Sequence, residues 1–145
     1  MIVSTMKPMK TVLLTKTHIE SIPIHDADLV SVELQPIPTF NARLALTIKL
    51  HSDESHEMLT TLGVRGDTFV ARFERCWRLM LDLLCHQADE HTIADWIIVP
   101  DSPFLARLKR EGMGPSGNVL HHRFDFSSGS VIEVVSERVS IGPAS

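Results

Sequence analysis

A regular alternation of apolar and polar residues over residues 42–50 restricts the fold of this chain more than any other feature. From Leu44 onward every second residue is a leucine or an isoleucine, ending at Leu50. Successive side chains of a strand point to opposite faces, so the pattern predicts a strand with one buried and one solvated face. Residues 29–35 alternate in the same way, and the proline-containing segment between the two strands predicts an antiparallel hairpin.

Residues 68–84 fit two different periods. A period of two and a helical period both account for their apolar residues, among them Phe73 and Trp77. We predict two strands with a bend near residues 74–76. A helix capped by Asp67 is the alternative, because the arginine, leucine and methionine residues that follow are good helix formers.

The following segment predicts a strand and then a helix. Residues 93–99 are mostly apolar and stop at Pro100. Residues 102–111 carry a capping serine, Ser102, with Pro103 at the first helical position and basic residues in the last turn. We therefore predict a short helix over residues 102–111.

The C-terminal part predicts a second hairpin. Residues 119–126 and 131–141 are rich in β-branched and aromatic residues, and serines and a glycine separate the two segments. Glu133 and Glu137 interrupt the valines of the second arm, which predicts an edge or surface strand, because charged side chains protect free edges from aggregation.

These elements predict one α+β domain over residues 1–145, since the chain has the length of one ordinary domain and no internal repeat or linker. We expect a mostly antiparallel sheet of about six or seven strands, strongly curved or partly rolled, with one short helix packed on it. Residues 1–10 are expected to form a flexible N-terminal segment.

The cysteines and the N-terminus indicate a cytoplasmic protein. Cys76 and Cys85 lie among apolar residues and form no CxxC pair, which is typical of core residues in a reducing compartment. The apolar run at residues 12–14 is too short for a signal-peptide core or a membrane span. Neither export nor membrane association is expected.

The charge is distributed in blocks. The formal net charge is −4, and residues 17–42 and 79–106 contain acidic residues but no lysine or arginine. Such blocks argue against a nucleic-acid partner and favour an acidic surface that attracts a basic protein; the alternative is solvated faces that neutralise one another. From charge alone, the candidate partner-binding residues are Asp26, Asp28, Asp89, Glu90, Asp95 and Asp101.

Chemical motifs are missing from the sequence. Eight histidines raise the question of a metal, but there is no HExxH motif, and the neighbours His121 and His122 would point to opposite faces of a strand. There is also no nucleophile elbow and no glycine-rich phosphate loop. We expect no cofactor, no metal and no catalysis, with a minor hydrolase that uses histidine and carboxylates as the least favoured alternative.

Three stretches share a pattern of strands and one helix: IHDADLVSVE at residues 24–33, IADW at 93–96 with DSPFL at 101–105, and LHHRFDF at 120–126 with residues 129 and 131–135. The pattern resembles that of the small β-rich immunity proteins that bacteria encode beside polymorphic or contact-dependent toxins. This resemblance implies a protein that binds and blocks the C-terminal domain of a cognate toxin, and it carries over no binding residues.

Two further expectations concern an alternative function and the oligomeric state. The alternative function is a small-ligand binding module whose apolar pocket is lined by Trp77, Trp96 and Phe124. The oligomeric state is expected to be a monomer, or a weak homodimer through the exposed edge of the last hairpin.

Overall fold

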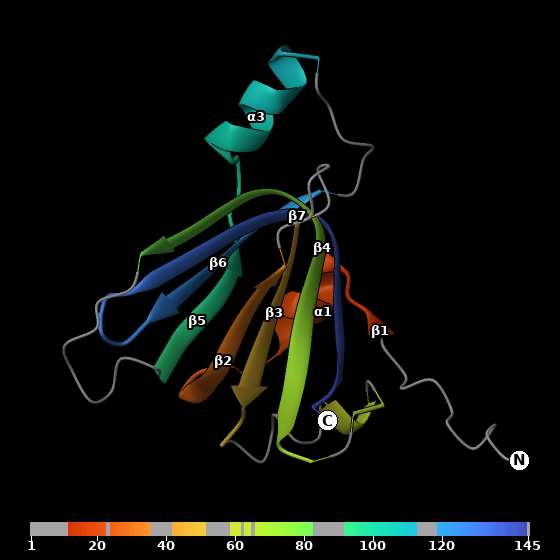
Figure 1. The fold of residues 1–145 in the computed structure, drawn as a ribbon, viewed down its shortest axis with the longest axis vertical. Coiled ribbons are helices and arrows are strands. Elements are labelled where there is room, and N and C mark those ends of the chain that lie inside the picture. Colours follow the sequence, from red (N-terminus) through yellow and green to blue (C-terminus); the bar gives the residue numbers. More distant parts are fainter. Residues whose placement is uncertain are drawn as a thin grey trace, which may run out of the picture.

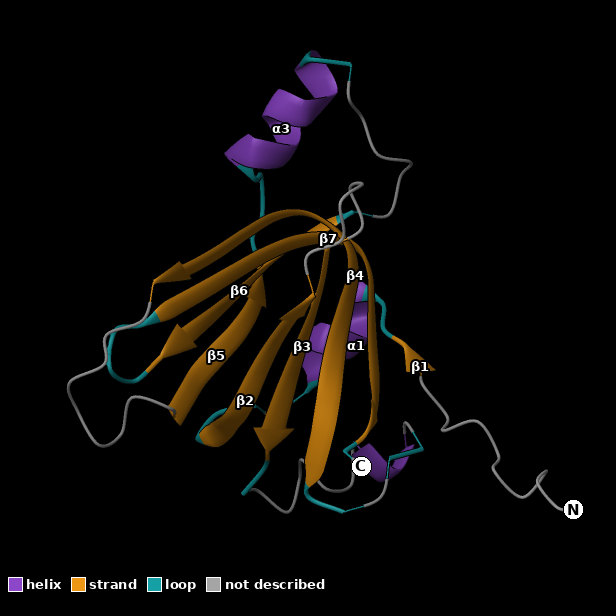
Figure 2. Ribbon diagram, viewed as in Figure 1, coloured by secondary structure: helices purple, strands orange, loops and turns teal. Residues whose placement is uncertain are grey.

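The structure is a computed structural model that describes residues 12–22, 24–35, 42–51, 59–61, 63–64, 66–82, 92–112 and 119–144. The predictions made for residues 1–10, Cys85, Asp89 and Glu90 lie outside this part of the chain. The elements are β1 (Val12–Leu13), α1 (Lys16–Ser21), β2 (Ala27–Gln35), β3 (Ala42–Lys49), β4 (Thr68–Asp82), β5 (Thr92–Ile98), α3 (Pro103–Arg110), β6 (Leu120–Phe126) and β7 (Val131–Pro143). Figure 2 shows that strands make up most of the molecule.

Six of these strands close into an antiparallel barrel in the order β4-β3-β2-β5-β6-β7, and β7 pairs back with β4 (Figure 1). The predicted β-rich, antiparallel architecture is confirmed, and so are the two hairpins β2–β3 and β6–β7. The expected curved or partly rolled sheet is wrong in one respect, because the sheet closes on itself. β1 adds two residues to the later part of β7.

The β7 strand is paired along both of its edges, so the predicted edge or surface position is wrong. Ser136 pairs with Leu120 of β6 on one side and with Cys76 of β4 on the other. Its two edges are used in this way because closure brings β4 and β6 to either side of it. The edge that we expected to support a homodimer is therefore occupied.

Residues 68–82 form a single long strand, β4, and the helical alternative is wrong. The expected bend is present: Arg75 has a positive φ of 54°, and the register against β7 shifts between Cys76 and Arg78. Figure 1 shows β4 and β7 bending together at this point. A bulge increases the local twist, which allows one strand to follow the barrel wall around a corner.

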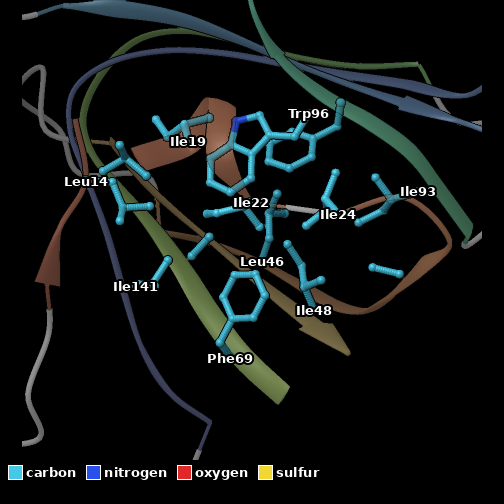
Figure 3. Close-up of a cluster of buried hydrophobic side chains, with 14 of the residues drawn as sticks. Leu14, Ile19, Ile22, Ile24, Leu46, Ile48, Phe69, Ile93, Trp96 and Ile141 are labelled. Atoms are coloured by element: carbon cyan, nitrogen blue, oxygen red, sulfur yellow. The ribbon is translucent and has the colours of Figure 1, made fainter. Parts of the chain in front are cut away.

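The α1 segment supplies part of the core. Thr15 caps the helix by accepting from the His18 amide, and His18 Nδ1 in turn accepts from the Thr15 amide. Ile19 is 1% exposed, and Figure 3 shows it beside Trp96, with Ile22 in the same cluster of side chains. The short helix thus packs its apolar side against the inner faces of the strands, where burial of apolar area stabilises the fold.

Helix α3 begins as predicted, with Ser102 accepting from the Leu105 amide and proline in the first turn. Its predicted packing on the sheet is wrong, because α3 extends beyond one end of the barrel (Figure 1). Leu108 is its only buried residue, so the helix has no wide apolar face to lay on the strands. A contact of 5.1 Å between the Arg78 guanidinium and the Phe104 ring links α3 to β4. In the described residues, no helix is long and apolar enough to cross a membrane.

Candidate functional site

Four rings from three strands form an aromatic cluster inside the barrel: Phe73, Trp96, His122 and Phe124. Phe73 lies at its centre, with ring centroids 4.9 Å from His122, 6.0 Å from Phe124 and 6.1 Å from Trp96. Phe73, His122 and Phe124 are 0% exposed. Trp96 and Phe124 are thus buried in the core and Trp77 is half-buried, and none of the three lines the pocket that follows.

His122 is the polar member of the aromatic cluster. The indole N–H of Trp96 donates to His122 Nδ1 over 3.2 Å. Burial, together with the neighbouring His121, lowers the pKa of His122 to about 3, so the ring is neutral near pH 7. Since Nδ1 accepts, the single ring proton is on Nε2. This Nε2 is buried and has no hydrogen-bond partner in the described residues.

A pocket of about 530 Å³ lies beside His122. Its lining comes from the β1–α1 segment, the bend of β4, the start of β6 and the middle of β7. The buried lining residues are Leu14, His122, Ser136 and Val139, and Leu13, Lys16, Arg75 and Arg138 are exposed. The pocket thus has an interior of mixed polarity and a polar, solvated mouth.

The mouth carries an excess of positive charge. Lys16, Arg75 and Arg138 line it together with one carboxylate, Glu137, whose oxygen lies 3.8 Å from an Arg75 nitrogen. Three cations and one anion leave two positive charges at the opening. Below them, the Ser136 hydroxyl donates to the Arg138 carbonyl over 3.2 Å. The entrance of the pocket therefore has a positive electrostatic potential.

The outer face of β6 carries a different polar group. His121 Nδ1 lies 2.6 Å from Ser102 Oγ, and His121 Nε2 lies 2.7 Å from Glu133 Oε1. The chain of serine, histidine and carboxylate has the residue types of a hydrolase, but Ser102 is 5% exposed and its oxygen already accepts the Leu105 amide as the helix cap. We assign it a structural role, because it satisfies buried polar groups and holds the start of α3 against the barrel.

The structure brings together three of the acidic residues predicted to bind a partner. Asp26 donates its amide to the Ile93 carbonyl, Asp28 lies opposite Thr92, and Asp95 follows on the same strand. An oxygen of the Asp28 carboxylate lies 2.7 Å from His51 Nε2. We give the name seam to this region, where β2 meets β5 through two described residue pairs, together with the exposed remainder of β2.

The fourth described candidate is elsewhere. Asp101 follows Pro100 beyond the other end of β5, next to the cap of α3, and has a positive φ of 50°. It is therefore separated from Asp95 by the length of the later half of β5. Charge alone could not make this distinction, since both residues are acidic and exposed.

The seam also exposes apolar side chains. Beyond Asp28 the described pairing of β2 is with β3 alone. Val30 is 58% exposed and Leu34 is 47% exposed, and Glu33 lies between them on the exposed part of the strand. An accessible strand with apolar side chains is a common protein-interaction surface.

The described residues contain no group of three histidine, cysteine or carboxylate side chains that could hold a metal ion. The side chains of His121 and His122 lie on opposite faces of β6, as the strand period predicts. His121 contacts Ser102, and His122 accepts from Trp96.

Sequence reasoning did not identify the lining of the pocket or the partners of His121. Lys16, Arg75 and Arg138 lie far apart in the chain and share no motif. The one available signal was the polar residue at a predicted helix cap, Ser102, although nothing in the sequence pairs it with His121. Comparisons of the chain with protein-family models, with curated proteins and with solved structures gave no match.

Proposed function

We propose that this chain is a non-catalytic inhibitor that binds the C-terminal domain of a cognate bacterial toxin through the seam, inside the cell that produces both proteins. The observation that carries the proposal is the exposure of Val30 and Leu34 on a strand whose surroundings are acidic. The resemblance of the sequence to immunity proteins supplies the class of partner.

The arrangement of the seam suits a basic protein surface. Asp26, Asp28 and Asp95 lie at the start of β2, and Glu33 adjoins Leu34 near its end with its side chain on the opposite face. The paired β3 strand adds two cations, Arg43 and Lys49, and Lys49 lies opposite Asp28. Complementary charge accelerates encounter, while apolar anchors at the centre of an interface provide most of the binding energy. The seam offers both within one region.

The pairing of β2 among the described residues supports the mode of binding. A partner strand or loop could pair with β2 beyond Asp28, where the described ladder has β3 on one side only. Inhibition would then follow from occlusion of the toxin's active surface, without turnover. Asp101 lies outside the proposed interface.

The test is titration calorimetry against the purified C-terminal domain of the large protein encoded beside this chain, at low and moderate salt. We expect nanomolar binding that weakens as salt is added, because exposed charges are screened within about 10 Å at 0.1 M ionic strength.

Two matched variants locate the interface. Glu33→Lys in the seam should weaken binding at least tenfold, whereas Glu111→Lys at the end of α3 makes the same change of charge on another part of the surface and should alter binding less than twofold. Val30→Thr should weaken binding without changing its salt dependence. Equal effects of the two lysine variants, or the absence of binding to the neighbouring protein, would refute the proposal.

A further inference from the structure

We propose that the later half of β4 is the interface of a weak homodimer, in which a second copy of this chain pairs its own β4 edge antiparallel to the first. Up to Cys76 the β4 strand lies between β3 and β7, whereas from Arg78 to Asp82 its described partner is β7 alone. Figure 1 shows this half of β4 as the outermost strand beside β7 and β6. Its residues do not belong to the seam, and the proposal does not rest on the toxin-inhibitor function.

The one-sided pairing of residues 78–82 leaves an edge that can accept another strand. Such an edge favours pairing with an extended chain, and soluble proteins block it with charges, prolines or bulges. The only charged residues of this segment are one arginine and one aspartate, at its two ends. Charges of opposite sign attract a second copy that aligns them, so these residues permit self-association through the edge.

The sequence of the segment is self-complementary. In an antiparallel pair about a two-fold axis through Met80, Arg78 lies opposite the second copy's Asp82, and Leu79 lies opposite its Leu81. The axis generates each of these contacts twice. Directly opposite residues have Cβ atoms about 5 Å apart, and both opposite charges and apolar side chains stabilise a sheet at that distance. A shift of one residue in either direction would place Arg78 opposite a leucine, so the match is specific to this register.

The charges of Arg78 and Asp82 have no ion-pair partner among the described residues. Both side chains are exposed, and four residues of strand separate them by about 13 Å, so they cannot pair with each other. The Arg78 guanidinium lies 5.1 Å from the centre of the Phe104 ring, a contact that does not neutralise its charge. Each charge is therefore available to a second copy.

The exposure of Leu81 is a second, independent observation. Leu81 lies opposite Ile132 of β7, which is 0% exposed, so both side chains are on the core face of the sheet. Leu81 is nevertheless 42% exposed, and the described residues place no strand on the side of β4 away from β7 here. In the dimer it is covered by Leu79 of the second copy, which is itself half-buried. Burial of these leucines supplies the apolar part of the interface.

The first experiment is sedimentation velocity of the full chain between about 1 μM and about 500 μM. Residues 78–82 form an interface far smaller than the roughly 20–30 residues a side of a standard one, so we expect micromolar association. The sedimenting mass should rise from the 16.2 kDa of one chain toward twice that value. The mass of a single chain at the highest concentration would overturn the proposal. No toxin domain is present, so this failure is distinguishable from failure of the proposed function.

Exchange of the two charges tests the register. Arg78→Asp places acidic side chains opposite one another and Asp82→Arg places basic ones, so each variant alone should dimerise at least tenfold more weakly than the native chain. An equimolar mixture of the two variants brings opposite charges together again and should form a heterodimer within threefold of the native affinity. Recovery in the mixture also shows that both variants are folded. Native affinity in either single variant, or no recovery in the mixture, would refute the interface.

The matched control is Arg110→Asp, which makes the same substitution at an exposed arginine in the last turn of α3. It should leave the dimer affinity within twofold of the native value. A loss equal to that of Arg78→Asp would show a general effect of net charge and overturn the assignment.

Amide hydrogen exchange locates the contact on the chain. Protection should increase with protein concentration in residues 78–82 and stay constant in β2, the other strand with a one-sided described pairing. An increase in β2 without one in residues 78–82 would place the dimer contact elsewhere and overturn the proposal.

Discussion

Two parts of the barrel differ in how their strands are joined. We call β4, β6 and β7 the wall, where β4 and β7 stay paired from Phe69 opposite Pro143 to Asp82 opposite Val131. At the seam, the described residues of β2 and β5 share only the pairs Ala27–Ile93 and Asp28–Thr92. Ile132, Val134 and Val135 of the wall are 0% exposed, whereas most of β2 after Leu29 is exposed.

From this difference we expect the wall to stabilise the fold and the seam to be available for binding. The wall buries side chains from both of its long strands and pairs the backbone of β7 on both sides, so it contributes strongly to the stability of the barrel. The seam is held by few pairs and exposes apolar and acidic side chains, which is the state expected of a surface that gains partners by binding. The same closed sheet therefore contains a structural half and an interacting region.

The largest expected effect comes from breaking the aromatic cluster behind the wall. Phe73→Ala removes a fully buried ring that contacts three others, and should lower the free energy of unfolding by about 3–5 kcal/mol. Val32→Ala, a partly buried residue near the seam, should cost about 1 kcal/mol. Urea denaturation measures both, and equal losses would contradict the division between wall and seam.

The second prediction concerns the pH dependence of the free energy of unfolding, which results from the burial of His122 on β6. Its imidazole titrates at about 3 in the folded protein against 6.5 in an unfolded chain, so between these pH values only the unfolded state takes up the proton. Stability is therefore lost as the pH falls, by about 3 kcal/mol between pH 7 and pH 4 from this residue alone.

The measurement is the difference in stability between the two pH values for the native sequence and for His122→Phe. The variant lacks the titrating group, so its loss on acidification should be smaller by that amount. An NMR titration gives a direct check, because the His122 ring signals should remain those of the neutral form down to pH 4. A normal histidine titration near pH 6.5 would contradict the buried, neutral state.

The third prediction, with a smaller effect than the first two, lies on the outer face of the wall. Ser102→Ala removes both the cap of α3 and the hydrogen bond to His121, and should cost about 1–2 kcal/mol. Because α3 is held at this end, trypsin should also cleave faster at Arg107 and Lys109. Ser127→Ala in the exposed turn of the last hairpin is the control and should change neither quantity. Unchanged cleavage in Ser102→Ala would show that other contacts hold the helix.

Local patterns predicted the elements well where the period was clear. The alternation at residues 42–50 gave the strand β3 with Leu44, Leu46 and Ile48 buried, and the serine–proline start gave α3. The helix α1 was not predicted, because six residues are too few to show a helical period and His18 takes the capping-box position usually held by glutamate or glutamine. For the candidate sites, the acidic block at residues 17–42 pointed to the seam, and no local signal pointed to the pocket.

What the sequence determined by itself is the strands β2, β3, β5, β6 and β7 and, where the alternation is clear, the face on which a side chain lies; for residues 68–84 it left a helix open as the alternative. These follow from local geometry, since a period of two assigns His121 and His122 to opposite faces without knowledge of their neighbours. Only the tertiary structure decided that the sheet closes, that Asp95 joins Asp26 and Asp28 while Asp101 does not, and that Lys16, Arg75 and Arg138 meet above His122. Those outcomes depend on pairing between segments far apart in the chain, and pairing of that kind is set by the packing of the whole barrel.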